Sequence, residues 1–115
     1  MKKLVYSPDY TEKMREIKKY LEMQFGAAVR KKVIREIGTR VRSLREYEDI
    51  GISVREMYGV DTDCLCIFVE KNYVFYKVKP ESIYVVNIYN EREDFMMDIF
   101  GIKTTTQETE DYWDE

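Results

Sequence analysis

The segment of residues 72–95 constrains the fold of this chain more than any other. It holds two runs rich in Tyr, Val, Ile and Phe, joined by the turn residues Lys79-Pro80-Glu81-Ser82. β-Branched and aromatic residues on either side of a Pro-containing turn predict an antiparallel β-hairpin. A third apolar run precedes it, so we expect three strands in consecutive hairpins, at residues 64–69, 73–79 and 83–89.

The N-terminal segment predicts one strand followed by a long helix. Residues 3–6 are partly β-branched, and Ser7-Pro8 ends them. Ser7 is a favourable N-cap, and Pro8 suits the first helical position, where its missing N–H costs nothing. A helix of about 18 residues is expected to follow and to end at Gly26. Its apolar face comprises Tyr10, Met14, Ile17, Leu21 and Phe25.

A second helix begins almost at once. Its apolar stripe comprises Val29, Val33, Ile37, Val41 and Leu44. Because the link between the two helices is so short, they must fold back on each other as an antiparallel hairpin. Gly38 inside the second helix costs about 1 kcal/mol relative to Ala, so either the backbone packs closely there or the helix is locally weak.

The remaining segments are less regular. Residues 47–63 lose the helical period and form a predicted connecting loop, in which only Val54–Tyr58 is strand-like. After the last strand, Asn90 and Glu93 have the spacing of a capping box, which predicts the start of a short helix. Gly101 is expected to close that helix.

These elements predict one α+β domain at residues 1–101, followed by an acidic C-terminal tail at residues 102–115. The predicted order is β-α-α-β-β-β-α, with the helical hairpin packed on a curved, mostly antiparallel sheet. Hydrophobic residues make up 44% of the chain and charged residues 36%, which is typical of a globular protein. No apolar run approaches the roughly 20 residues that cross a bilayer, so we expect no membrane partner and a cytoplasmic location.

The net charge of −3 conceals an asymmetry between the two halves of the chain. Residues 1–45 contain 13 Lys and Arg against 5 Asp and Glu, whereas residues 46–115 contain 6 against 17. The helical hairpin is therefore basic. A basic helical face serves nucleic acid or an acidic protein partner, although a solvated surface is the commoner explanation of such a run.

The chain lacks the residues on which several kinds of catalytic and metal-binding sites usually depend. The chain has no His, the commonest general acid and base. Its two cysteines, Cys64 and Cys66, lie two apart in a predicted strand, which suits small core thiols rather than a disulfide or a zinc site. Glu91, Glu93 and Asp94 are better explained by helix capping than by a magnesium site. We expect no metal and no cofactor.

The element order, together with two stretches of sequence, resembles the RelE/ParE toxin superfamily of type II toxin-antitoxin systems. The stretches are the Tyr-x-Phe-Tyr-Lys-Val strand of residues 73–78 and the Glu91-Arg92-Glu93-Asp94 corner after the Ile-Tyr strand of residues 83–89. The resemblance covers about residues 2–101 and implies growth inhibition, plasmid stabilisation and neutralisation by a cognate antitoxin. RelE-like members are ribosome-dependent mRNA endoribonucleases, whereas ParE-like members bind DNA gyrase and are not nucleases.

The resemblance to the nuclease group is the weaker one. Those members tend to use Arg and Lys on the middle strands, Arg at the corner, and Tyr or His on the last helix. Here Tyr73 and Val74 stand where Arg is usual, and the last helix has neither Tyr nor His. A RelE-like nuclease would have to use Arg92, Arg55 and Tyr73. Acidic neighbours of Arg92 and a sequence pI of 5.2 both disfavour an mRNA site.

Three functions therefore stay open, with the ParE-like one favoured. In the ParE-like function, the hairpin and the sheet bind gyrase or the antitoxin. In the second, the ribosome and mRNA are the partners of a nuclease. In the third, the chain is an inactive interaction module. The predicted partner-binding residues are Arg30, Lys31, Arg35, Arg42, Lys77 and Tyr84.

Overall fold

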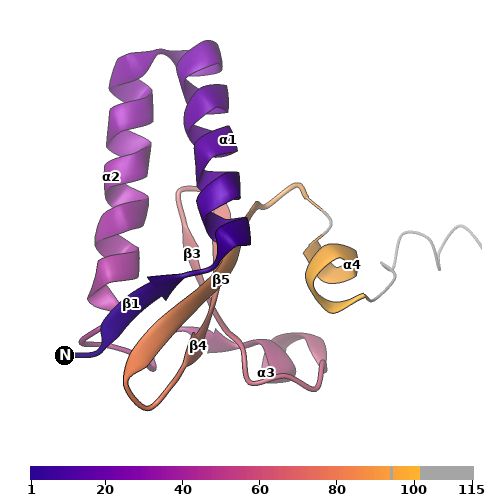
Figure 1. The fold of residues 1–115 in the computed structure, drawn as a ribbon. Helices are drawn as coiled ribbons and strands as arrows, with labels where there is room; N and C mark the ends of the chain where they lie inside the picture. The colour runs from indigo at the N-terminus through magenta and orange to yellow at the C-terminus, as the bar shows by residue number, and fades with distance from the viewer. Residues whose placement is uncertain (94, 102–115) are drawn as a thin grey trace, which may run out of the picture.

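The computed structural model describes residues 1–93 and 95–101 (Figure 1). The predicted acidic tail, with Tyr112 and Trp113, lies outside the described residues. The elements follow the chain in this order: β1 (Lys3–Tyr6), α1 (Pro8–Phe25), α2 (Ala27–Ser43), β2 (Ile52–Ser53), α3 (Val54–Tyr58), β3 (Leu65–Val69), β4 (Asn72–Val78), β5 (Ser82–Asn90) and α4 (Phe95–Phe100).

The strands form one five-stranded sheet in the order β1-β5-β4-β3-β2. β1 is parallel to β5, and the other three pairs are antiparallel. Among the described strands, the last one, β5, is therefore the inner neighbour of the first one, β1. The predicted α+β class and the mostly antiparallel sheet are confirmed.

The α1–α2 hairpin covers one face of the sheet. Both helices contribute to the core there, which includes Tyr10 from α1, Ile37 and Val41 from α2, and Ile83 and Val85 from β5. Figure 1 shows the two helices side by side, with their linked ends projecting beyond the sheet. As predicted, α1 begins at the N-cap Ser7 and ends at Gly26, whose φ of 90° is a conformation that L side chains rarely adopt.

A second apolar cluster lies on the opposite face. Phe75 is fully buried at its centre, and Phe95 of α4 stacks on it with ring centroids 5.2 Å apart. Cys64 and Cys66 are buried in the same cluster as free thiols. Burial raises the pKa of the Cys66 thiol to about 12, so that thiol is not reactive at neutral pH.

One predicted element was wrong. Val54–Tyr58 is the short helix α3 rather than a strand, and the strand of this region is the two-residue β2 just before it. Local capping explains the difference. The Ser53 hydroxyl accepts from the Glu56 N–H at 3.3 Å, and Gly59, with a φ of 70°, ends the helix.

The predicted capping box at Asn90 forms, but not as the start of a helix. The Asn90 N–H donates to Glu93 Oε1 at 3.2 Å, and the Asn90 side chain accepts from the Arg92 N–H at 3.1 Å. These bonds close a turn, and α4 begins only at Phe95. The bonds that a capping box makes are also those of an Asx turn, so the sequence signal fits both.

β5 carries one extra residue opposite β4. Phe75 pairs with Asn87 and Tyr76 pairs with Val85, which leaves Val86 as the residue of a β-bulge. Ser7 meets this bulge: its N–H donates to the Val85 carbonyl at 3.0 Å, and its hydroxyl donates to the Val86 carbonyl. The bulge thus lies where β1 ends and α1 begins.

Tyr76 anchors the loop that follows α2. Its ring is fully buried, and its hydroxyl donates to the Glu48 carbonyl and accepts from the Gly51 N–H, both at 2.9 Å. A methyl group on Gly51 would lie 2.5 Å from that hydroxyl oxygen. Gly51 is therefore required by the close approach of Tyr76.

Candidate partner-binding surface

Three of the predicted partner-binding cations follow one stripe of α2. Lys31, Arg35 and Arg42 are spaced by four and seven residues, a spacing that places their side chains on one side of a helix. All three are exposed. Gly38 lies on the same stripe, and we call these four residues the α2 stripe.

Gly38 makes room for a cation rather than for another backbone. A methyl group on Gly38 would come within 2.9 Å of Arg42 Nη1, and the guanidinium carbon would be the next closest atom. The Arg42 side chain therefore lies back along the helix over Gly38, towards Arg35. The absence of a side chain at Gly38 makes the row of positive charge continuous.

The positive charge of the α2 stripe is not neutralised by the described part of the chain. Lys31 and Arg35 take part in none of the ion pairs or hydrogen bonds found among residues 1–93 and 95–101. Arg42 donates only to the Thr39 hydroxyl, at 3.4 Å. The stripe can therefore accept the carboxylates of a partner without losing pairs of its own.

Arg30, the fourth predicted cation of the hairpin, is placed differently. It lies 3.9 Å from Glu22 Oε2, across the link between α1 and α2, and its side chain is only partly exposed. Its Nε atom is buried and has no hydrogen-bond partner among the described residues. Arg30 therefore helps to hold the two helix ends together and adds less to the exposed charge.

The linked ends of the hairpin expose a group of apolar side chains, two of which belong to the predicted apolar stripes of the helices. We call this group the hairpin tip: Tyr20, Met23, Phe25 and Val29, which are 59%, 74%, 59% and 39% exposed. Phe25 and Val29 belong to the predicted apolar stripes of the two helices, but both side chains are exposed. Because α1 starts beside Val85, halfway along β5, it runs past the end of the sheet.

Lys77 and Tyr84 lie on the opposite face from the hairpin. They are cross-strand partners on β4 and β5, and Tyr84 is also paired with Val5 of β1. Their neighbours Val78 and Ile83 face the hairpin, so the alternation of strand side chains turns Lys77 and Tyr84 the other way. The six predicted partner-binding residues therefore occupy two separate surfaces.

The three candidate nuclease residues are not joined to one another. Arg55 on α3 pairs with Asp61 at 2.9 Å. The Tyr73 ring packs between two other aromatic rings: its centroid lies 4.8 Å from that of Phe68 and 5.2 Å from that of Phe95 in α4. Arg92 is exposed in the turn before α4. None of the hydrogen bonds or ion pairs of the described chain connects any two of them.

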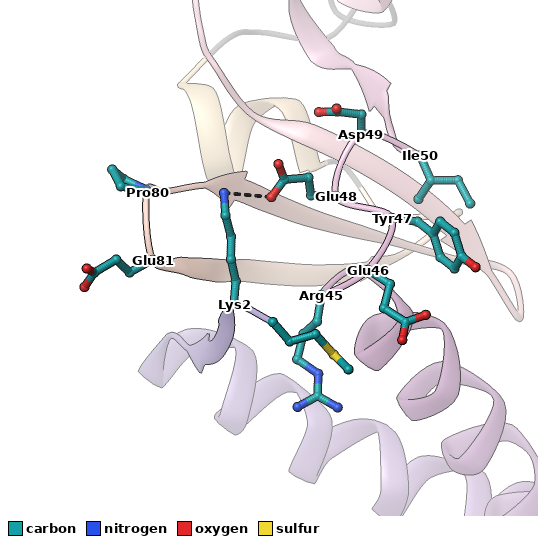
Figure 2. A pocket seen from close by; sticks show the side chains of 10 residues that line it. Lys2, Arg45, Glu46, Tyr47, Glu48, Asp49, Ile50, Pro80 and Glu81 are labelled. Atoms are coloured by element: carbon teal, nitrogen blue, oxygen red, sulfur yellow. Dashed lines mark ion pairs between the residues drawn. The ribbon is translucent and has the colours of Figure 1, made fainter.

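An open pocket of about 760 Å³ lies at the other end of the molecule from the hairpin tip (Figure 2). Lys2 crosses it, with Nζ 2.7 Å from Glu48 Oε2 and 2.7 Å from the Lys79 carbonyl oxygen. The pocket holds no predicted site residue. Its lining mixes both charges: Met1, Lys2, Arg45, Glu46, Tyr47, Glu48, Asp49, Ile50, Pro80 and Glu81.

A groove of about 500 Å³ lies where α1, β5 and α4 meet. Two polar contacts lie in or beside it: the Tyr89 hydroxyl donates to the Asp98 carboxylate, and Lys13 Nζ lies 2.5 Å from Glu93 Oε2. Burial raises the pKa of Tyr89, and the neighbouring Asp98 raises it further, so Tyr89 stays protonated at neutral pH. These contacts hold α4 against the rest of the fold.

The described residues contain no cluster of three or more Cys, Asp or Glu side chains that could hold a metal ion. Nor does any helix in this part of the chain combine the length and apolar character needed to cross a membrane. The features that remain for a partner are the charge of the α2 stripe, the apolar hairpin tip, and the sheet row with Tyr84.

Comparisons with known proteins agree with this fold. Residues 4–95 match the family described as the ParE toxin of the type II toxin-antitoxin system, parDE. A solved chain described as the chromosomal ParDE TA system from P. aeruginosa is similar in fold, with a TM-score of 0.65 and 15% sequence identity. The match covers 78% of this chain and 96% of that one. No curated protein sequence matches significantly. The predicted superfamily resemblance is confirmed.

Proposed function

The chain belongs to the ParE toxin family of type II toxin-antitoxin systems, and from that membership we propose that it inhibits growth by binding DNA gyrase. We further propose that a cognate antitoxin neutralises it and that both events take place in the cytoplasm. The observation that supports binding is the placement of the cations. Three exposed cations that form no ion pair within the described residues lie on one stripe of α2, whereas the candidate nuclease residues lie apart from one another.

A binding function needs charge and apolar area on one surface, and the hairpin supplies both. The α2 stripe provides positive charge, which speeds the approach of an acidic partner and selects its orientation. The hairpin tip provides aromatic and Met side chains, which are enriched at protein interfaces. We propose the hairpin as the gyrase-binding surface.

The antitoxin is expected to contact the hairpin and the sheet together. Antitoxin binding fits the solved relative, which is described as part of a toxin-antitoxin system. A disordered acidic segment gains affinity by folding along such surfaces. Tyr84 and Lys77 on the opposite face lie where an encircling partner would contact β4 and β5.

The test is a supercoiling assay with purified DNA gyrase and relaxed plasmid. The wild-type chain is expected to inhibit supercoiling, and the double variant Lys31→Glu/Arg35→Glu is expected to inhibit it much less. The matched control, Lys3→Glu/Lys79→Glu, reverses two exposed charges outside the hairpin and should inhibit as the wild type does.

A parallel reaction with ribosomes and mRNA separates the other possibilities. Unimpaired supercoiling together with cleaved mRNA would establish a RelE-like ribonuclease instead. Unimpaired supercoiling with intact mRNA, and no growth arrest on expression, would leave an inactive interaction module. Either result would contradict the proposed gyrase-binding function.

A further inference from the structure

We propose that the chain's own C-terminal segment, residues 102–115, binds to the outer surface of the helical hairpin and covers it in the free protein. The segment lies beyond Gly101 and outside the residues that match the family. It contains one cation, Lys103, against five carboxylates: Glu108, Glu110, Asp111, Asp114 and Glu115. The proposed ligand of the basic hairpin surface is therefore a segment of the same chain.

The first support is charge complementarity. Lys31, Arg35 and Arg42 are exposed in a row and form no ion pair with the described acids. Each exposed ion pair is weak by itself, but several carboxylates close together in the sequence can face several cations of the α2 stripe at once. The hairpin surface attracts the segment, whereas the acidic remainder of the chain repels it.

The second support is apolar complementarity. Tyr112 and Trp113 lie among the acids of the segment. The hairpin tip exposes Tyr20, Met23 and Phe25, and Lys31 is the cation of the α2 stripe nearest to the tip along the chain. Aromatic rings pack favourably against one another and against Met side chains. The hairpin therefore carries both cations and aromatic side chains, and the segment carries both carboxylates and aromatic side chains.

The third support is reach. Lys13 binds Glu93 just before α4, and Ile99 of α4 lines a groove together with residues of α1, so the last described helix lies beside the first half of α1. From Lys13 to Phe25 the helix rises by about 18 Å. The residues between Gly101 and Trp113 can extend to about 40 Å. A tethered segment of this length has an effective concentration in the millimolar range, which favours binding within the molecule.

The segment would then compete with any acidic partner for the hairpin. This consequence does not depend on whether that partner is an antitoxin or gyrase. The docking itself can be measured on the isolated full chain, because Trp113 is its single tryptophan. Its fluorescence reports the environment of the segment and of nothing else.

The experiment records the emission maximum of Trp113 and its quenching by acrylamide. At low salt the wild type should show blue-shifted, protected emission. About 1 M salt shortens the Debye length to about 3 Å and should shift the emission to the red. Lys31→Glu/Arg35→Glu should show the red-shifted, quenchable emission already at low salt, and the control Lys3→Glu/Lys79→Glu should match the wild type.

A second variant leaves the hairpin unchanged. Glu108→Gln/Glu110→Gln/Asp111→Asn should also shift the emission to the red at low salt. Emission of a fully solvated indole in the wild type, or equal shifts in the test and control pairs, would overturn the proposal. A blue shift that appears only as protein concentration rises would also overturn it, because the segment would then bind a second copy.

Discussion

The Ser7 hydroxyl donates a hydrogen bond to the carbonyl of Val86, a residue 79 positions away, at the bulge of β5. The same oxygen accepts from the Tyr10 N–H at 2.9 Å, as the N-cap of α1. One small buried side chain thus joins the end of β1, the start of α1 and the bulge of β5. It fixes where the hairpin starts on the sheet.

Ser7→Ala is expected to lower the free energy of unfolding by about 1–3 kcal/mol, because it removes a helix cap and leaves the partly buried Val86 carbonyl without this donor. Urea unfolding followed by circular dichroism measures this. Ser53→Ala is the control, because Ser53 also caps a helix but lies outside the core. Equal losses in the two variants would show that the bond to Val86 adds nothing.

A methyl group added at Gly51 and one added at Gly38 are expected to change the stability of the fold in opposite directions. Gly51→Ala should destabilise the fold, since its Cβ would lie 2.5 Å from the hydroxyl of the buried Tyr76. Gly38→Ala should stabilise it by up to about 1 kcal/mol, because only the flexible end of Arg42 has to shift. Thermal unfolding of the two variants provides the comparison. A destabilising Gly38→Ala would mean that the position of Arg42 matters for the fold.

The fold is expected to lose stability at alkaline pH because the buried Tyr76 ionises there. Burial raises its pKa from 10.0 to about 12 in the folded state, although the hydrogen bond from Gly51 acts in the opposite direction. The folded chain therefore holds this proton more tightly than the unfolded chain does. Its contribution is complete below pH 10 and is lost as the pH rises towards 12.

Tyr76→Phe tests this pH dependence. The variant should be less stable at pH 7, because the Gly51 N–H and the Glu48 carbonyl lose their partner. Its stability should also fall less steeply than that of the wild type between pH 10 and 12. Urea unfolding at a series of pH values measures both effects, and parallel curves for the two proteins would contradict the assignment to Tyr76.

The turn between β3 and β4 offers a stabilising substitution. Glu70 and Lys71 both have positive φ, 49° and 63°, as a two-residue hairpin turn of this kind requires. Lys71→Gly should therefore raise the free energy of unfolding by about 1 kcal/mol. Lys79→Gly, in the turn before β5 where no positive φ occurs, should not stabilise the fold. A gain at both positions would point to lost charge rather than relieved strain.

Arg92→Ala is expected to leave growth inhibition unchanged. Arg92 is exposed in a turn between Glu91 and Glu93, and its backbone N–H makes the only hydrogen bond found for it among the described residues. Controlled expression with plate counts and transcript sequencing measures the effect. Loss of toxicity with Arg92→Ala, together with loss of mRNA cleavage, would identify Arg92 as part of a nuclease site.

Local signals predicted much of the fold. Ser7, Pro8 and Gly26 act within a few residues of themselves, so the bounds of α1 could be read from the sequence. The three strands after residue 64 were also predicted closely, because alternation and turn residues are local features. The two-residue β2 was too short to leave any periodic pattern.

The features of the fold that the sequence did not predict depend on contacts between residues far apart in the chain. The insertion of β5 between β1 and β4 depends on pairing between residues at opposite ends of the chain, such as Leu4 and Ile83. The exposure of Phe25 depends on where α1 starts along β5, which no helical period reveals. For the same reason the sequence could not show that Lys77 and Arg35 lie on different faces.

The order of the strands also sets when a folded molecule can first exist. Among the described strands β1 is made first and its partner β5 is made last, and Lys3 pairs with Ser82. A growing chain can form the α1–α2 hairpin early, but the apolar side of that hairpin stays uncovered until β5 has left the ribosome. Residues up to Asn90 must therefore be synthesised before the sheet closes, and chains that a stalled ribosome releases before that point should be substrates for proteases rather than active molecules.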